Sequence, residues 1–586
     1  MILENKLGIK DDAKLALEEE RISKKKAVEL LDNNIFNELK IEKISSLTII
    51  HHYLFENLYD FAGKICSSDV TNDHCSSEIA LNITQAVSVV AELPQSTFDQ
   101  IVKKYIALCA IHPFVKGNGR SIRIWFNLIL KSKLKKVVDW SKIEKEKYIK
   151  AMEHSIVSDV EIKQLMQKAL VDDINSRDLY ISNIDASYSY SGFDTFKTKD
   201  LFTKIGIIDA DLLGRNKHRF PNLACEKISG YWKARGATVK LLDNYNWGDE
   251  YDHVYVSKVF TDTPMPVELT ETEKIHIGGT GFFFDQAPNL PDEIEHHMPD
   301  YHLYDEWIEN QVAKARDERG DSFNEKSFRL KFKEYKDYCI GFLTRGCFRK
   351  CEFCVNKKYD HAFKHSPLDE FYYEDCKKIC LLDDNFFGCP HWKEMLLELK
   401  AKNKPFKFKQ GLDERLLTEE KCEMLFSSNY DGDFIFAFDK ISDYDLIHEK
   451  LKMIRKYSSS KNIKFYVLTG FDSTDHVDIE NTFKRIALLL KYECLPYLMR
   501  YQDKNKTPWK ESPYAGMYIA MARWCNQPSI LKKMSFRYFC EANQALRSNQ
   551  DTYCSSMKAM TEFEKAHPEI AEKYFDLKFG EITDEI

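Results

Sequence analysis

The chain has 586 residues, of which 44% are hydrophobic, 13% aromatic and 30% charged, and its formal net charge at pH 7 is −7. One hydrophobic core does not organise a chain of this length, so we expect about two to four domains. The composition is typical of a soluble globular protein, and the negative charge gives no general attraction to nucleic acid or to a membrane surface. We therefore expect neither of these as a partner.

The first residues, MILENKLGIKDDAK, lack the apolar segment of a secretory signal, and no apolar run is long enough to span a bilayer. These features predict a cytoplasmic protein. In a reducing compartment the sixteen cysteines are more often free thiols or metal ligands than disulfides.

The chain up to about residue 198 has the pattern of helices, with apolar residues three and four positions apart. We predict a helical domain over residues 1–198. The segments that carry this pattern are SSLTIIHHYLFENLYDF, QIVKKYIALCAI, SIRIWFNLILKSKL and EIKQLMQKALVDDI.

From about residue 203, short runs with β-branched residues replace the helical pattern. The runs KIGIID and TVKLLD flank a helical stretch, NLACEKISGYWKARGA, and HVYVSKVF and EKIHIGG follow. This βαβ alternation predicts a Rossmann-like α/β domain over residues 203–320.

Residues 330–586 contain six strand candidates separated by helical patterns, and a C-terminal helical extension follows them. Six βα units predict a partial (β/α)6 barrel, in which the chemistry takes place at the carboxyl ends of the strands. The strand candidates are YCIGFL, KICLLD, FKFKQ, DFIFAF, KFYVLT and PYLMRY.

The stretch HPFVKGNGR joins two predicted helices and is suited to hold phosphate beside a base. Its glycines let backbone N–H groups converge on an anion, and the following helix adds its positive end. Two arginines three positions apart can reach one polyphosphate, and a histidine can take a proton from a hydroxyl. The simpler alternative is an ordinary turn with a surface histidine. The residues of this predicted site are His112, Lys116, Gly117, Asn118, Gly119, Arg120 and Arg123.

The stretch HPFVKGNGRSIR resembles the Fic family signature His-Pro-Phe-x-Asp/Glu-Gly-Asn-Gly-Arg-x-x-Arg at eight positions. The neighbouring stretches HHYLFENLYDFAGKI and LKKVVDWSKIEKEKYIKAME extend the resemblance. It implies an all-α fold and transfer of AMP from ATP, or of another phosphate-containing group, to a hydroxyl of a target protein. In this resemblance His112 is the general base, Phe114 a core anchor, Gly117 to Gly119 the anion cradle, and Arg120 and Arg123 the phosphate arginines.

Two positions depart from the family. Lys116 stands where the family has an acidic residue that binds Mg²⁺. Ser191, four positions after Ser187, stands where an inhibitory helix would carry a glutamate that pairs with the second arginine, Arg123. Both exchanges remove a carboxylate and make the site more positive.

Three interpretations of Lys116 remain open. The lysine could contact phosphate directly and replace the metal. The ligand could be another compound, or adopt another pose, that needs no Mg²⁺. Finally, the domain could bind a nucleotide or a partner protein without turnover, because losing a metal costs transition-state stabilisation. Since His112 and both arginines are retained, we expect retained or altered catalysis.

The second motif is TRGCFRKCEFCVNKK, whose cysteines have the spacing C-x₃-C-x₂-C with an aromatic residue before the last. Three thiolates on one loop can bind three irons of a [4Fe–4S] cluster and leave the fourth iron open. A zinc site is the alternative, but its fourth ligand would have to come from Cys339, which falls inside a predicted strand.

The motif, its place after the first strand and the strand number resemble the radical S-adenosylmethionine (SAM) superfamily. The resemblance implies SAM bound to the open iron, a 5′-deoxyadenosyl radical that abstracts hydrogen from a substrate, and an electron donor such as a flavodoxin or ferredoxin. LLDDNFFG ends the second strand, where relatives bind the SAM amino group, although the usual Gly-Gly-Glu is absent; a turn and helix cap is the alternative. The implied cluster ligands are Cys347, Cys351 and Cys354, and the SAM contacts are Phe353, Asp383, Asp384 and Asn385.

Two further features of this region are weaker indications of a functional site. Polar residues at other strand ends are suggestive only by their location. Three late cysteines are spaced irregularly, which favours free thiols over a second cluster. The strand-end candidates are Gln410, Asp413, Asp439 and Asp472, and the late cysteines are Cys525, Cys540 and Cys554.

The Rossmann-like region resembles the domains, often cobalamin-binding, that precede some radical SAM barrels. The hallmark Asp-x-His-x-x-Gly is not met, because DADLLGRNKH offers Asp209 and Gly214 with Asp211 in place of the histidine, and His218 is too far along. We expect no cobalamin, or cobalamin held without a histidine. The stretch GGTG, Gly278 to Gly281, favours a tight turn over a phosphate site.

These observations predict a bifunctional enzyme that joins Fic-type transfer to radical SAM chemistry. A rival hypothesis makes the barrel the only enzyme and the Fic-type domain a nucleotide- or partner-binding module. A third hypothesis is a partner-binding protein without catalysis.

Overall fold

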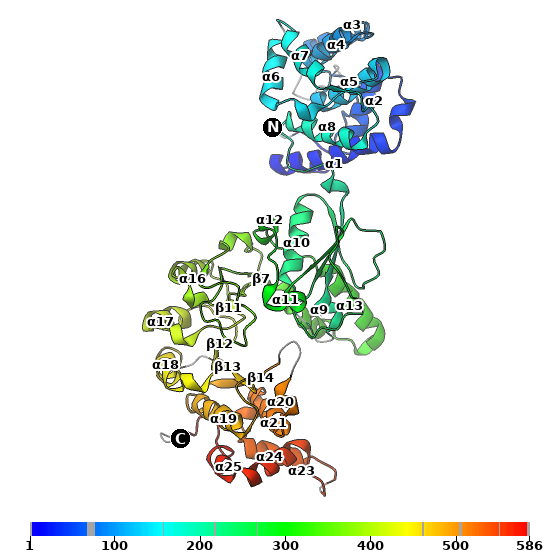
Figure 1. Cartoon of the computed structure of the whole chain (residues 1–586). Helices are drawn as coiled ribbons and strands as arrows, with labels where there is room; N and C mark the ends of the chain where they lie inside the picture. Colours follow the sequence, from blue (N-terminus) through cyan, green and yellow to red (C-terminus); the bar gives the residue numbers. More distant parts are fainter. Residues whose placement is uncertain are drawn as a thin grey trace. The chain divides into compact units, whose positions relative to one another are not determined.

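The computed structural model describes residues 3–66, 77–155, 157–215, 218, 220–266, 268–459, 462–502, 507–549 and 551–582. The chain divides into two compact units (Figure 1). The first comprises Met1–Ile205, Trp232–Val239 and Glu250–Asp252, and the second comprises the remaining segments. The second unit therefore includes most of the predicted Rossmann-like region and the whole of the predicted barrel region.

The first unit is mostly α-helical, as its apolar periodicity predicts. One predicted helix ends early, at Lys168, because Leu170–Val171 pairs in antiparallel fashion with Val137–Val138. The helices are α1 (Asp12–Asp32), α2 (Ile44–Phe55), α3 (Ser77–Ala91), α4 (Phe98–Ile111), α5 (Asn118–Leu134), α6 (Lys145–His154), α7 (Val160–Lys168) and α8 (Arg177–Ser189), and the strands are β1 (Val137–Val138) and β2 (Leu170–Val171).

Helix α5 is the centre of this unit. Eleven of its side chains are buried, among them Trp125 and Phe126, which lie in one apolar cluster with Tyr105 and Trp140. The preceding helix α4 begins with a capping box between Thr97 and Gln100. The capping box fixes the start of α4, and the buried side chains hold α5 in the core. Both helices that flank the HPFVKGNGR loop are therefore fixed in place.

The Rossmann-like region forms a four-stranded sheet with the order β4-β3-β5-β6, in which β5 and β6 are parallel. All four predicted strands and the predicted helix are present. Their bounds are β3 (Lys204–Asp209), β4 (Thr238–Leu241), β5 (His253–Ser257), β6 (Ile275–Gly278) and α10 (Leu223–Ala234); the shorter helices are α9 (Ala210–Gly214), α11 (Thr280–Phe283) and α12 (Asp292–Glu295), and α13 (Asp305–Arg319), α14 (Glu325–Arg329) and α15 (Lys333–Lys336) follow.

All six predicted strands of the third region are also present, in two parallel three-stranded sheets with the orders β11-β10-β7 and β12-β13-β14. Isolated parallel bridges join Phe406 to Tyr430 and Leu412 to Phe436, between the two sheets. The strands are β7 (Tyr338–Gly341), β10 (Lys378–Leu381), β11 (Phe406–Phe408), β12 (Phe434–Ala437), β13 (Ile463–Thr469) and β14 (Leu495–Arg500).

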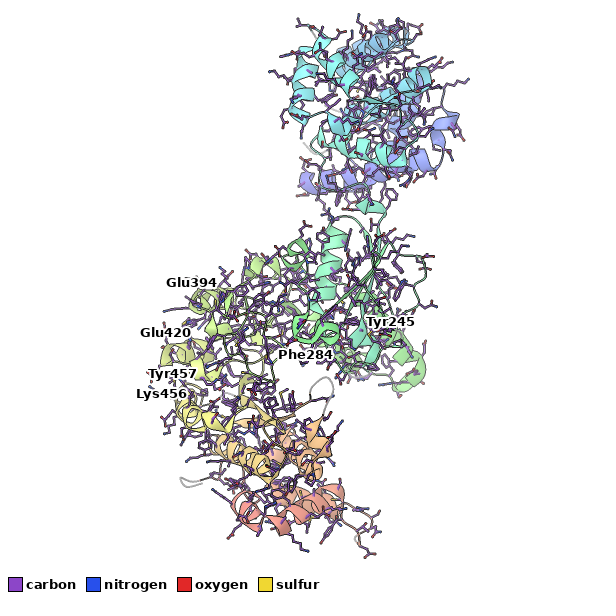
Figure 2. All side chains as sticks on the ribbon, viewed as in Figure 1. Tyr245, Phe284, Glu394, Glu420, Lys456 and Tyr457 are labelled. Carbon is purple, nitrogen blue, oxygen red and sulfur yellow. A yellow bond between two sulfur atoms is a disulfide. The ribbon has the colours of Figure 1, made fainter. Side chains whose placement is uncertain are left out.

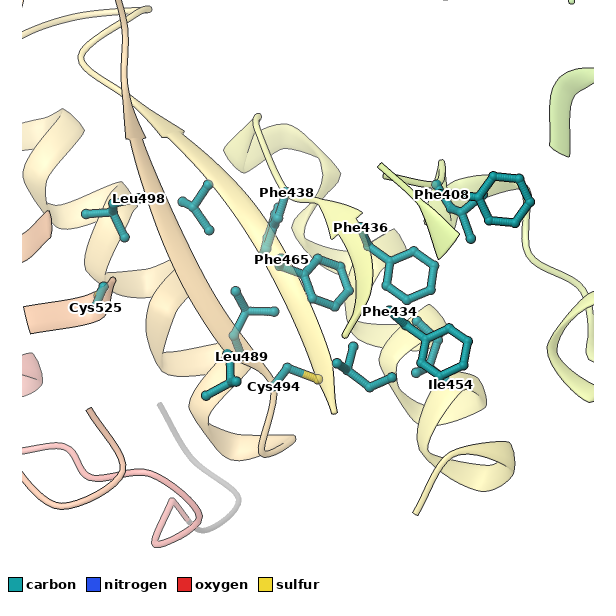
Figure 3. Close-up of a cluster of buried hydrophobic side chains, with 14 of the residues drawn as sticks. Phe408, Phe434, Phe436, Phe438, Ile454, Phe465, Leu489, Cys494, Leu498 and Cys525 are labelled. Carbon is teal, nitrogen blue, oxygen red and sulfur yellow. The ribbon is translucent and has the colours of Figure 1, made fainter. Parts of the chain in front are cut away.

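Helices cover these strands on the outside. Figure 3 shows Phe434, Phe436 and Phe465 in the apolar layer between the strands and the helices, together with Ile454 and Leu489. Charged residues such as Glu420 and Lys456 lie on the outer surface of this layer (Figure 2). The helices are α16 (Trp392–Ala401), α17 (Glu419–Phe426), α18 (Tyr444–Tyr457) and α19 (His476–Lys491), and the C-terminal extension contains α20 (Pro508–Glu511), α21 (Ala515–Cys525), α22 (Pro528–Leu531), α23 (Phe536–Ala545), α24 (Ser555–Ala566) and α25 (Pro568–Tyr574).

A short hairpin that the sequence did not reveal follows β7. Its strands are β8 (Thr344–Arg345) and β9 (Phe363–Lys364), and they pair in antiparallel fashion. Each strand has only two residues, too few for an alternating pattern to be recognised. The hairpin forms the stem of the loop that carries the cysteine motif.

One pair of cysteines departs from the expectation of free thiols or metal ligands. Cys339, in β7, forms a disulfide with Cys376, which precedes the neighbouring strand β10. The parallel pairing of these strands brings the two Cα atoms to 5.9 Å. Within the described chain, Cys525, Cys540 and Cys554 form no disulfide.

No helix of the described segments is long and apolar enough to cross a membrane.

The close packing of Gly341 predicts a local sensitivity. A Cβ atom at this position would lie 2.3–2.6 Å from ring carbons of the buried Phe371. We expect Gly341→Ala to destabilise the second unit by about 1–3 kcal/mol through overpacking. The measurement is the midpoint of urea unfolding. Gly278→Ala is the matched control, because a Cβ atom added there would meet no atom of the described chain within 4 Å; equal shifts in both variants would contradict this packing.

Candidate functional site

The HPFVKGNGR loop lies between α4 and α5. Helix α4 ends at Ile111 and is capped by His112, whose backbone has a left-handed φ of 52°. Gly117, with a φ of 85°, precedes the first turn of α5, and a Cβ atom there would lie 2.5 Å from the Phe55 ring. Asn118 closes the loop, since its side chain accepts from Phe114 N–H at 2.8 Å and donates to Phe114 C=O at 2.6 Å. Glycine is therefore required where the loop turns into the helix.

His51 on α2 packs against this loop and is hydrogen-bonded to it. Its Nδ1 accepts from Gly63 N–H at 2.9 Å, so its Nε2 carries the proton and donates to Lys116 C=O at 2.8 Å. Its ring stacks on Phe114 with centroids 3.8 Å apart. Burial lowers the pKa of His51 to about 4, so the ring is neutral at pH 7. Phe114, itself 2% exposed, is buried in the core, where the resemblance places an anchor.

The ammonium group of Lys116 forms an ion pair with Glu19 of α1, at 2.8 Å between Nζ and Oε2. The other oxygen of Glu19 accepts from Arg120 Nη2 at 2.6 Å, and the Tyr59 hydroxyl also donates to the carboxylate. The Glu19 side chain is fully buried. A carboxylate from outside the motif therefore joins two predicted phosphate-binding residues.

Arg120 and Arg123 are both buried, with 2% and 4% of their surface exposed. Arg123 Nε donates to Ser187 Oγ at 2.7 Å, and Nη2 donates to Ser187 C=O at 2.6 Å and to Ser191 Oγ at 3.3 Å. Ser191 is thus beside Arg123, where the resemblance places the inhibitory glutamate. Gly119 packs directly against this guanidinium, because a Cβ atom there would lie 3.0 Å from Arg123 Nη1.

Aromatic side chains at the end of α8 cover both guanidinium groups. Arg120 faces the rings of Tyr188 and Phe193 at 5.3 and 4.5 Å from their centroids, and Arg123 faces Tyr190 at 5.4 Å. Sequence reasoning did not assign these rings or Glu19 to the site. The stretch SYSYSGF carried a recognisable aromatic signal, whereas Glu19 is one of three successive glutamates with nothing to distinguish it.

His112 is exposed at the mouth of the loop, and its Nδ1 lies 3.5 Å from Ala110 C=O. This position leaves the ring open to an approaching group. The structure thus joins Lys116 to Arg120 through Glu19 and packs Arg123 on Gly119.

A second site lies at the carboxyl ends of the strands of the second unit. The cysteine loop leaves the β8–β9 stem, and Asp384 at the end of β10 accepts from Gly346 N–H at 2.8 Å and from Asn356 Nδ2 at 2.7 Å. Asp383 is buried and accepts from Thr344 N–H and Oγ1, both at 2.6 Å. Both aspartates therefore hold the loop. Burial raises the pKa of Asp383 to about 7.

Asn385 and Asp413 connect the loop to strands β10 and β11. Asn385 Nδ2 donates to Cys347 Sγ at 3.3 Å, and it also lies 3.4 Å from Asp413 Oδ2. Asp413 in turn accepts from Arg349 Nε at 2.8 Å. Of the weaker strand-end candidates, Asp413 thus joins the loop, Asp439 is partly buried, and Gln410 and Asp472 are exposed.

Phe353 contacts a residue at the end of β13, which in turn contacts a residue at the end of β14. Its ring meets Phe471, which follows β13, edge to face at 5.4 Å, and Phe471 meets Tyr501 after β14 at 4.7 Å. The loop therefore contacts residues at the carboxyl ends of strands from both parallel sheets.

The chemistry of the three thiols fits an iron–sulfur cluster. Backbone N–H groups of Arg349 and Asn356 donate to the sulfurs of Cys347 and Cys354 at 3.4 and 3.3 Å, in addition to the Asn385 amide. Such donors stabilise bound thiolates. In the metal-free thiols, burial raises the pKa of Cys351 and Cys354. Across the described residues, however, no group of three or more His, Cys, Asp or Glu side chains has the arrangement of a metal site.

In the Rossmann-like region, Asp209 and Asp211 accept hydrogen bonds that hold the segments after the strands. Asp209 accepts from the N–H groups of Asp211 and Leu212 and from the Tyr304 hydroxyl at 2.9 Å. Asp211 accepts from Val259 N–H at 2.6 Å and so holds the loop after β5. His218 lies edge to face with Phe260, and Gly279 and Gly281 pack against the Lys258 carbonyl as a turn.

Comparison with known proteins finds a family match in the part of the chain that carries the first site. Residues 43–130 match the Fic/DOC family, which confirms the Fic-type domain predicted at the N-terminus. Protein adenylyltransferase VbhT of Bartonella schoenbuchensis is 27% identical over 218 residues, covering 33% of this chain and 44% of that protein. The chain thus spans less than half the length of this curated relative.

Two solved structures are similar to different parts of the chain. The N-terminal Fic domain of a cell filamentation protein from Bartonella quintana, with bound ADP, is 20% identical at a TM-score of 0.23, covering 29% of this chain and 90% of its own. The cobalamin-dependent S-adenosylmethionine radical enzyme OxsB is 10% identical at a TM-score of 0.32, covering 65% of this chain and 63% of its own.

The ion pairs of Glu19 predict a pH-dependent contribution to stability. Burial opposes ionisation, but Arg120 and Lys116 outweigh it and lower the pKa of Glu19 below 4.5. A lowered carboxyl pKa stabilises the fold above the unfolded-state value, and the contribution is lost as the pH falls through the folded-state value. We expect Glu19→Gln to lose about 3–5 kcal/mol at pH 7.

The measurement is the unfolding midpoint of wild type and Glu19→Gln by calorimetry at several pH values. The difference between the two proteins should shrink as the pH falls below 4.5. A difference that is the same at neutral and acidic pH would show that the charge of Glu19 does not stabilise the fold.

Proposed function

We propose that the chain is a bifunctional enzyme: its first unit transfers AMP, or another phosphate-containing group, to a protein hydroxyl, and its second unit carries out radical SAM chemistry. The match of residues 43–130 to the Fic/DOC family, together with the loop around Gly117, carries the first assignment. The cysteine loop above the strand ends carries the second.

In the first unit the loop residues have distinct roles. The first turn of α5 offers unpaired N–H groups and the positive end of the helix to the phosphates of ATP. Lys116 and the two arginines supply positive charge, and the lysine takes the place of the Mg²⁺-binding carboxylate. His112, exposed at the mouth, accepts the proton of the attacking hydroxyl of a target protein.

In the second unit Cys347, Cys351 and Cys354 would hold a [4Fe–4S] cluster. When bound, this cluster supplies the electron that cleaves SAM into methionine and the 5′-deoxyadenosyl radical. The chain's own residues position the loop: Asp383 and Asp384 fix its stem, and Asn385 donates to the sulfur of Cys347. Phe353 would contact the adenine of SAM, mainly through its backbone. The electron comes from a donor protein such as a flavodoxin or ferredoxin.

One observation favours the rival hypothesis that only the second unit is catalytic. Arg120 and Arg123 are buried beneath aromatic rings, and Lys116 is engaged by Glu19. In this conformation the first unit would serve as a binding module. Labelling with alkyne-tagged ATP separates the two hypotheses, because only a transferase attaches the tag to protein.

The cysteine assignment gives a direct test. After anaerobic reconstitution, Cys347→Ala, Cys351→Ala and Cys354→Ala should each lose most of the bound iron and all SAM cleavage, because each removes one of three ligands. Iron analysis and release of 5′-deoxyadenosine are the measurements. Cys525→Ala, on the buried face of α21, should keep both properties. A triple variant that retains its iron would disprove the ligand assignment.

The transferase assignment is tested at His112. His112→Ala should reduce transfer from tagged ATP by about 10²–10⁴-fold, because general base catalysis contributes this much, while ATP binding stays nearly unchanged. His52→Ala is the control, since His52 is an exposed histidine on α2 outside the loop. If both variants transferred as well as wild type, His112 would not be the base.

A further inference from the structure

Glu19 makes contacts that a bound anion would make. Its fully buried carboxylate pairs with Arg120 through one oxygen and with Lys116 through the other, at 2.6 and 2.8 Å. Two of its three partners belong to the phosphate loop, and Tyr59 is the third. One carboxylate of the chain therefore occupies the two cations that would otherwise face an anionic ligand.

The neighbouring glutamate shows that this contact is specific to one position. Glu20 is equally buried, but it pairs with Lys24 at 2.9 Å and accepts from Phe196 N–H at 3.0 Å. Its partners lie outside the loop. Helix α1 thus directs only Glu19 toward the motif.

Lys116 and Arg120 both keep N–H donors that Glu19 does not use. Lys116 is 32% exposed, and its ammonium group has three donors, of which Glu19 takes one. Arg120 Nη1 is buried and, among the described atoms, has no hydrogen-bond partner. An unpartnered guanidinium N–H beside a half-exposed ammonium group is a setting that favours an incoming oxyanion.

We propose that Glu19 is an internal anion that competes with polyphosphate ligands for Lys116 and Arg120. The ligand class is a polyphosphate bound without a divalent metal, since Lys116 stands where the motif would otherwise place a metal-binding carboxylate. Binding then requires the phosphate to displace the Glu19 carboxylate from Lys116. This inference rests on the phosphate-binding role proposed for the loop and specifies how that role is restrained.

The experiment is calorimetric titration of inorganic pyrophosphate into the full-length protein in EDTA. Glu19→Gln keeps the shape of the side chain and removes its charge, so both cations become available. We expect it to bind pyrophosphate about tenfold or more tightly than wild type, the value of one charge-assisted hydrogen bond. Glu20→Gln, which also breaks a buried ion pair, should bind as wild type does.

A second pair of variants tests whether the gain passes through Lys116. Lys116→Met alone should weaken wild-type binding by less than about tenfold, because the lysine must give up its pairing with Glu19 before it contacts the phosphate. The double variant Glu19→Gln/Lys116→Met should lose most of the gain of the single variant. Lys116→Met removes a half-exposed side chain, so this arm also serves if Glu19→Gln fails to fold.

Equal or weaker binding by Glu19→Gln, or no binding by any variant at millimolar pyrophosphate, would overturn the inference. A loss of about tenfold or more in Lys116→Met alone would also overturn it, because the lysine would then bind the ligand without competition from Glu19. Absence of labelling by tagged ATP would count against the transferase and would leave the pyrophosphate comparison standing.

Discussion

The first unit depends on the pairing of a fully buried carboxylate with two cations of the loop. A buried charge without a partner is strongly destabilising, so Glu19, Lys116 and Arg120 constrain one another. Glu19 comes from α1, Lys116 from the loop and Arg120 from the first turn of α5. The pairing therefore fixes the loop on the helical core, and any ligand that approaches Lys116 encounters an ammonium group that is already paired with a carboxylate.

The cysteine loop of the second unit is held by a similar device. Carboxylates at the ends of β10 and β11, Asp384 and Asp413, accept hydrogen bonds from Gly346 and Arg349 at its base. In both units a carboxylate outside the recognisable motif positions the loop that carries the motif. Such partners orient functional side chains as much as the motif residues themselves do.

Local patterns predicted most of the secondary structure and little of what surrounds the sites. Apolar periodicity located the helices around His112 and all six strands after residue 337, because burial of one face depends on neighbouring residues. The contact between Glu19 and Arg120 joins residues 101 positions apart, and nothing near Glu19 announces it. The β8–β9 hairpin and the disulfide of Cys339 were missed for the same reason: both depend on which strands pair.

The contacts of Arg123 and Lys116 differ in the groups that hold each cation. Arg123 donates to the hydroxyl groups of Ser187 and Ser191 and to the Ser187 carbonyl, and among the described residues it has no carboxylate partner. Hydroxyl groups bind a guanidinium less strongly than a carboxylate does. Ser191 stands where the resemblance places a glutamate, so Arg123 is held less strongly than a carboxylate would hold it. Lys116, by contrast, is held by the Glu19 carboxylate. The carboxylate beside these basic residues comes from the supporting helix α1, through Glu19, and release of Lys116 is the step that we propose a phosphate ligand must drive.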